Sequence, residues 1–105
     1  MPFIKKRRDK RPLEKEVEKK ACAYGRKTGW ECRKYTSPAH RSVPDRLCLH
    51  DFGTVIFIEF KRLGEDATDQ QLIEHKKLRA RGFTVYVIDN FEDAKRVLDE
   101  HNPYN

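Results

Sequence analysis

The sequence is poor in cysteine and contains no long apolar stretch. Its 105 residues include 3 cysteines and 4 histidines, and Cys22, Cys32 and Cys48 form no close pair along the chain. This odd and scattered set argues against a disulfide framework and against a structural zinc site. No apolar segment approaches membrane-spanning length, and the basic N-terminus lacks the apolar stretch of an export signal. We therefore expect an intracellular, cytoplasmic protein with no membrane partner.

Charge is plentiful and unevenly distributed. Charged residues make up 38% of the chain against 37% hydrophobic residues, which allows one modest core in a single domain. The formal net charge is +6, and the segment KKRRDKR at positions 5–11 holds six basic residues and one acid, so the rest of the chain is nearly neutral. We divide the chain into a basic N-terminal arm, residues 1–11, and a folded domain, residues 12–105.

The arm carries six candidate contacts for the phosphates of a nucleic acid. These residues are Lys5, Lys6, Arg7, Arg8, Lys10 and Arg11. Such a block neutralises phosphates without reading sequence, and its binding weakens steeply with salt. The same block is also typical of a solvated, unfolded leader, and both interpretations hold if the arm orders only on its ligand.

Apolar periodicity and turn residues predict the element order α-β-β-β-α-β-α. Helices are expected at 12–25, 68–81 and 91–102, and strands at 30–35, 46–50, 54–60 and 83–88. Gly25 is expected to end the first helix. Thr68 and Gln71 match a capping box at the start of the second helix, which Gly82 ends.

Two carboxylates and a lysine stand at unusual places in this pattern. The run Thr54 to Phe60 (TVIFIEF) predicts a buried strand, yet Glu59 and Lys61 end it on one face. Such charges are costly unless they pair, are solvated or hold an ion. Asp45 follows Pro44 at the start of the preceding strand, so adjacent strands bring both acids together. The pattern is typical of a divalent-metal phosphodiesterase site, with a structural ion-pair cluster as the alternative.

Several short motifs follow one another from the first predicted helix to the second. They are Glu14-Lys15-Glu16-Val17, Val43-Pro44-Asp45-Arg46-Leu47, Gly53, Ile58-Glu59-Phe60-Lys61, Gln71, Leu78 and Gly82. This succession, over roughly residues 13–98, resembles the VRR-NUC (virus-type replication-repair nuclease) domain of the PD-(D/E)xK superfamily. The resemblance implies an α/β, restriction-endonuclease-like fold with a mixed central sheet flanked by helices. If the protein is viral, the expected compartment is the host cytoplasm.

The resemblance also implies an active site built around Mg²⁺ or Mn²⁺. The implied catalytic residues are Asp45, Glu59, Lys61, Gln71 and Glu14, and the implied metal ligands are Asp45, Glu59, the backbone carbonyl of Phe60, and Glu14. Hard cations prefer such oxygen ligands, and a cation supplies an activated water and charge neutralisation for phosphodiester hydrolysis. Lys61 would orient or activate the water, and Gln71 would hydrogen-bond near it.

Two of these assignments have structural alternatives. Glu14 also suits the positive end of its helix, and Glu18 one turn later is the other candidate for the helical carboxylate. Gln71 also completes the capping box with Thr68. We prefer Gln71 to the adjacent Gln70 because Leu78 and Gly82 then fall at the spacing found in the family.

We expect a metal-dependent endonuclease that cuts branched DNA, of the Holliday-junction-resolving type, acting as a homodimer. Stand-alone members of the family resemble junction-resolving enzymes, and a twofold dimer brings two sites to two strands. Tyr35, His40 and Arg41 are candidate nucleic-acid contacts or plain loop residues. Phe83, Tyr86, Val97 and Leu98 would extend a dimer interface or complete the core. The alternatives are a monomeric nickase or flap nuclease, and a non-catalytic nucleic-acid-binding module.

Overall fold

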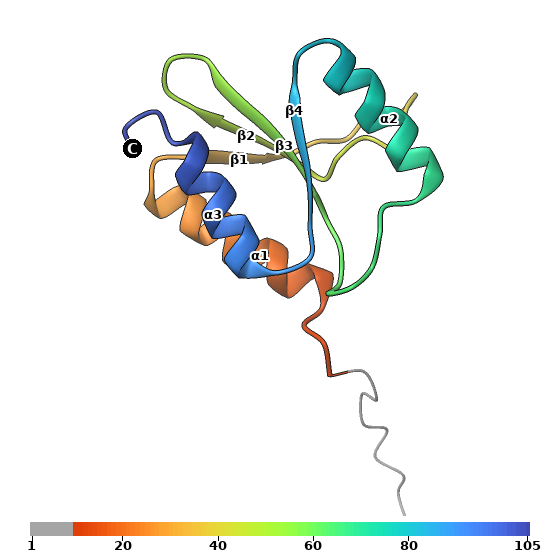
Figure 1. Cartoon of the computed structure of the whole chain (residues 1–105), viewed down its shortest axis with the longest axis horizontal. Helices are drawn as coiled ribbons and strands as arrows, with labels where there is room; N and C mark the ends of the chain where they lie inside the picture. The colour runs from red at the N-terminus through yellow and green to blue at the C-terminus, as the bar shows by residue number, and fades with distance from the viewer. Residues whose placement is uncertain (1–9) are drawn as a thin grey trace, which may run out of the picture.

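A mixed four-stranded sheet forms the centre of the computed structural model, which describes residues 10–105 (Figure 1). The elements are α1 (Glu14–Lys27), β1 (Glu31–Lys34), β2 (Arg46–His50), β3 (Thr54–Phe60), α2 (Asp69–Ala80), β4 (Thr84–Ile88) and α3 (Phe91–His101). The strands lie in the order β1-β2-β3-β4, antiparallel from β1 to β3 and parallel between β3 and β4. The expected order and the mixed sheet flanked by helices are confirmed.

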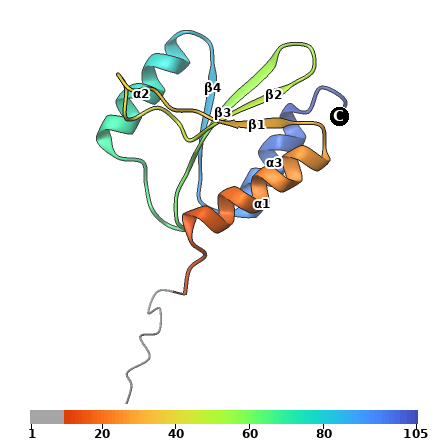
Figure 2. The same cartoon turned by 180° about the vertical axis from the view of Figure 1, so that it is seen from behind.

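The helices cover the two faces of the sheet unequally. Helices α1 and α3 pack side by side on one face, and α2 lies on the other (Figures 1 and 2). Alternation along β3 sends Ile56, Ile58 and Phe60 into the core with α1 and α3. Val97 and Leu98 of α3 are each 1% exposed in that same core, so they complete the monomer and are not available to a dimer interface.

Gly25 does not end α1, contrary to the expectation from sequence. The helix continues to Lys27, and the left-handed residue after it is Gly29, with a φ of 97°. Gly25 is buried inside the helix, where a Cβ atom would lie 3.0 Å from Cys32 Sγ and 3.4 Å from Trp30 Cβ. The missing side chain therefore lets α1 approach β1 closely.

The start and end signals of α2 are confirmed. Thr68 caps α2, and Gly82 follows it with a φ of 89°. The side chain of Asn90 accepts a hydrogen bond from the Asp93 amide at the start of α3. Within residues 10–105, no helix is long and apolar enough to cross a membrane.

Candidate active site

Strand pairing brings Asp45 next to Glu59. Arg46 pairs with Ile58 in the antiparallel register of β2 and β3, so the residues just beyond that pair, Asp45 and Glu59, are neighbours. The backbone N–H of Phe60 donates a hydrogen bond of 2.7 Å to Asp45 Oδ2. Pro44 is fully buried and holds the chain at this point. The structure therefore places together the two acids that the sequence predicted to meet.

Glu59 is a buried carboxyl group whose ionisation is opposed by its surroundings. Only 1% of the residue is exposed. Burial raises the pKa of Glu59 to about 8, with a hydrogen bond to Asp45 and the negative charge of Asp45 acting in the same direction. Its Oε1 atom is buried and has no hydrogen-bond partner in the part of the chain that the structure describes. A buried carboxylate in this state is unfavourable without a cation or a proton.

Lys61 and Glu14 belong to the same electrostatic cluster. The positive charge of Lys61 lowers the pKa of Glu59 and of Glu14. Burial raises the pKa of Glu14, and the nearby Asp45 carboxylate raises it further. Glu18, the alternative helical acid, instead accepts a hydrogen bond of 2.7 Å from Arg46 Nε. Of the two candidates on α1, Glu14 is therefore the one whose carboxyl group is not already bound to an arginine.

His75 is the site residue that sequence reasoning missed. It is 0% exposed on α2, and its Nε2 lies 3.5 Å from Glu59 Oε1. Burial lowers the pKa of His75, and the positive charge of Arg79 lowers it further, so the ring is expected to be neutral near pH 7. The available signal was its position one turn after Gln71, since residues four apart share a helix face.

Gln71 makes the capping interaction that the sequence also offered. Its side-chain Oε1 accepts a hydrogen bond of 2.9 Å from the backbone N–H of Thr68, and the backbone N–H of Gln71 donates one of 3.2 Å to Thr68 Oγ1. A role at the carboxylates would require this side chain to leave the capping box.

The loop between β1 and β2 carries the three predicted nucleic-acid contacts. Tyr35 is half-buried, and its ring packs at 5.6 Å from that of Phe57. Its amide also donates a hydrogen bond of 3.0 Å to the Asp45 carbonyl, so Tyr35 helps to fix the loop beside the site. His40 and Arg41 are exposed and line a shallow cavity with the first turns of α2.

The basic arm is described only at its end. Lys10 is exposed, and Arg11 Nη1 donates a hydrogen bond of 2.7 Å to the carbonyl of Leu63. Arg11 Nη2 also lies 3.7 Å from Glu65 Oε1, so Arg11 contacts the loop that follows β3. The predicted contacts Lys5, Lys6, Arg7 and Arg8 lie outside the described residues.

The donor atoms at the site are carboxylate oxygens, which hard divalent cations prefer as ligands. Asp45 and Glu59 provide adjacent carboxylates, and the unpartnered Oε1 of Glu59 is an oxygen atom that a cation would satisfy. Residues 10–105 contain no group of three or more His, Cys, Asp or Glu side chains positioned to hold a metal ion. A complete ligand set would therefore need backbone oxygen or water. The contact that Phe60 makes with Asp45 is through its amide N–H.

Known proteins are similar to most of this chain, although no family model matches it. The first is "Putative nuclease p44" of Acyrthosiphon pisum secondary endosymbiont phage 1, which is 40% identical over 89 residues, 85% of this chain and 95% of that protein. The second is a solved VRR_NUC domain with a TM-score of 0.77 and 26% identity, over 84% of this chain and 97% of that one. The chain therefore belongs to the VRR-NUC family of nucleases.

Proposed function

We propose that this nuclease is a divalent-metal-dependent DNA endonuclease whose active site is the Asp45–Glu59–Lys61 cluster. The observation that carries the proposal is Glu59, a carboxyl group with 1% exposure beside a second carboxylate. A purely structural cluster would satisfy this group with a salt bridge. Here the basic group nearest to Oε1 is His75 at 3.5 Å, whose pKa is lowered by burial, and Oε1 has no hydrogen-bond partner among the described residues. Perturbed carboxyl groups of this kind concentrate at functional sites.

The proposed ligands of Mg²⁺ or Mn²⁺ are Asp45, Glu59 and the backbone carbonyl of Phe60, with Glu14 joining them only after a shift of its side chain, because the described residues hold no ready-made group of three such ligands. When bound, the cation would supply an activated water and neutralise charge on the phosphate. The hydrogen bond from the Phe60 amide orients the Asp45 carboxylate. Burial of Glu59 keeps bulk water from its carboxyl oxygens, which strengthens any charge interaction at the site.

Lys61 would act on the reacting groups directly. Its charge lowers the pKa of Glu59 and of Glu14, which supports a role in which its ammonium group orients the attacking water and stabilises the charge that develops on the phosphate. His75 Nε2 lies 3.5 Å from Glu59 Oε1 and forms no hydrogen bond with it in this structure; we expect it to donate one to the Glu59 carboxylate when the cation is bound. A catalytic role for Gln71 stays a prediction, because its side chain is engaged with Thr68.

We further propose that the substrate is branched DNA, of the Holliday-junction type, and that the protein acts as a homodimer. Residues 10–105 carry one such cluster, so cutting two strands symmetrically needs two copies, and closed twofold dimers are the commonest arrangement. With Val97 and Leu98 in the core, other apolar side chains are available. Leu72 and Ile73 of α2 and the following Phe83 are 48%, 52% and 43% exposed.

The test is a cleavage panel of labelled four-way junctions, flaps, nicked duplexes and single strands with Mg²⁺ and with Mn²⁺. We expect paired cuts in opposing strands of the four-way junction, and light scattering should give the mass of a dimer. If the protein is a monomer and cuts only flaps, nicked duplexes or single strands, the proposed junction-resolving activity is rejected and the proposed nuclease site stands. DNA binding without cleavage by either metal would reject the enzyme in favour of a binding module.

A further inference from the structure

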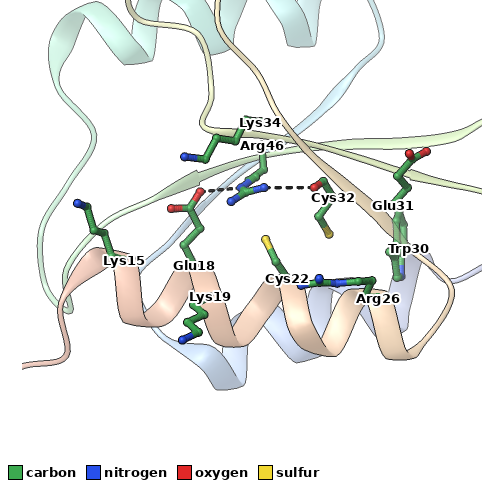
Figure 3. A pocket seen from close by; sticks show the side chains of 10 residues that line it. All are labelled: Lys15, Glu18, Lys19, Cys22, Arg26, Trp30, Glu31, Cys32, Lys34 and Arg46. Carbon is green, nitrogen blue, oxygen red and sulfur yellow. Dashed lines mark hydrogen bonds and ion pairs between the residues drawn. The ribbon is translucent and has the colours of Figure 1, made fainter.

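A groove runs between α1 and β1 on the outer side of the core (Figure 3). Lys15, Glu18, Lys19 and Arg26 line it from the helix, and Glu31, Lys34 and Arg46 line it from the strands. The buried side chains of Cys22 and Trp30, with the half-buried Cys32, also line it. Neutral side chains between charged rims concentrate the electric field of those rims within the groove.

The cations of this groove outnumber its acids, and both acids are already paired. Glu18 accepts a hydrogen bond of 2.7 Å from Arg46 Nε, and Glu31 lies 3.1 Å from Arg33 Nη2. No carboxylate within residues 10–105 forms an ion pair with the remaining cations of the groove. These are Lys15, Lys19, Arg26 and Lys34. The groove therefore presents four exposed positive charges to a ligand.

Three of these cations form one stripe along α1. Lys15, Lys19 and Arg26 are four and then seven residues apart, so they share a helix face. From Lys15 to Arg26 the helix rises by about 16 Å. Each strand of duplex DNA advances by about 3.4 Å per phosphate along the duplex axis, so a stripe parallel to that axis spans about five base-pair steps. The shape and sign of the groove suit an extended polyanion better than a single small anion.

One end of the groove meets the candidate active site. Lys15 follows Glu14 directly, and Arg46 follows Asp45. Lys34 is the register partner of Arg46 across β1 and β2. Figure 3 shows Lys15 and Lys34 at the same end of the groove, beside the Glu18–Arg46 pair. A DNA strand lying in the groove would therefore lead to the carboxylates.

We propose that the groove between α1 and β1 binds the sugar–phosphate backbone of the DNA strand on one side of the scissile bond. The proposal rests on the proposed nuclease function, because it assigns a track to the substrate of that site. The four cations contact the phosphates, and the neutral wall consists of Cys22, Cys32 and Trp30, whose indole N–H is buried and out of reach of base edges. The groove therefore adds affinity without sequence preference.

The test measures binding of a fluorescein-labelled duplex of about 20 base pairs by anisotropy, in EDTA so that no cleavage occurs, across a range of salt concentrations. The test variant is Lys15→Gln/Lys19→Gln. The matched control is Lys20→Gln/Lys27→Gln, which removes the same charge from exposed positions of the same helix outside the groove. Lys34→Gln tests the strand side of the groove independently, and thermal melting checks that each variant folds.

Removing two phosphate-binding charges should lower the log–log salt slope by about 1.8 and weaken binding about 30-fold at about 0.15 M salt. Lys34→Gln should lower the slope by about 0.9, and the control should keep the wild-type slope. Equal slopes for wild type, test variant and control would overturn the groove proposal, as would a wild-type chain that binds no DNA. Cleavage by wild type with Mn²⁺ is scored separately, so the nuclease proposal stands or fails on its own result.

Discussion

Replacing Glu59 by glutamine should stabilise the metal-free protein at alkaline pH, although it removes a carboxylate from the candidate active site. Glu59 is 1% exposed, and burial raises its pKa to about 8 from the ordinary value of 4.5. The folded state therefore holds this proton more tightly than the unfolded state. The resulting stability is fully present below about pH 4.5 and is lost as the pH rises through about 8. The glutamine amide of the variant would carry no charge at any of these pH values.

The size of the effect follows from the two pKa values. Each pH unit between 4.5 and about 8 corresponds to somewhat more than 1 kcal/mol of differential stability, so the upper limit is about 5 kcal/mol. We expect a gain of a few kcal/mol above about pH 8 and little difference near about pH 5. With the urea dependence of a small domain, this corresponds to a midpoint higher by about 1 M or more.

The assay is urea unfolding of wild type and Glu59→Gln in EDTA at several pH values from about 5 to about 9. The control is Glu92→Gln, which neutralises an exposed carboxylate in the first turn of α3. This control should lose a few tenths of a kcal/mol, because an acid favours the positive end of a helix. A Glu59→Gln variant that is less stable than wild type above about pH 8, or that keeps the wild-type pH dependence, would refute the reasoning.

Three further predictions address the supporting residues. His75→Leu should leave the free energy of unfolding unchanged or raise it by about 1 kcal/mol, because it removes ring nitrogens without hydrogen-bond partners in the described chain. The same variant should bind Mn²⁺ about 10-fold or more weakly in calorimetry, and unchanged binding would mean that His75 only fills space. Gly29→Ala should lower the free energy of unfolding by about 1 to 3 kcal/mol in urea, because Gly29 has a φ of 97° and the added Cβ would lie 2.7 Å from His50 Nε2. A decrease below about 0.5 kcal/mol would show that the turn relaxes freely. Deleting residues 5–11 should lower the salt slope of DNA binding by about 0.9 for each phosphate that the arm neutralises, whereas an unchanged slope would show that the arm does not touch the backbone.

The fold and the carboxylate pair were accessible from sequence because both depend on local, periodic signals. Alternation along β3 predicts which face each residue joins, and this alone separates Glu59 from Ile58 and Phe60. Turn and capping residues placed the other elements to within a few residues. Asp45 joins Glu59 because a short connection makes β2 and β3 antiparallel neighbours.

Features that depend on tertiary contact were not accessible. A glycine such as Gly25 is typical of a helix end, but here it lets α1 lie close to Cys32 and Trp30, a tertiary contact that no local pattern encodes. The burial of His75 depends on where α2 lies on the sheet. Likewise, the basic stripe on α1 becomes a groove only when β1 is placed beside it (Figure 3).

The most direct test of the central claim is single-turnover cleavage of labelled four-way-junction DNA with Mn²⁺ and with EDTA. It compares wild type, Asp45→Asn and the control Asp66→Asn, which changes an exposed loop residue. We predict Mn²⁺-dependent cleavage by wild type and control, and a rate at least about 100-fold lower for Asp45→Asn with DNA binding retained. Cleavage by Asp45→Asn at the wild-type rate, or equal cleavage by wild type in EDTA, would contradict the assignment of this cluster as a metal-dependent nuclease site.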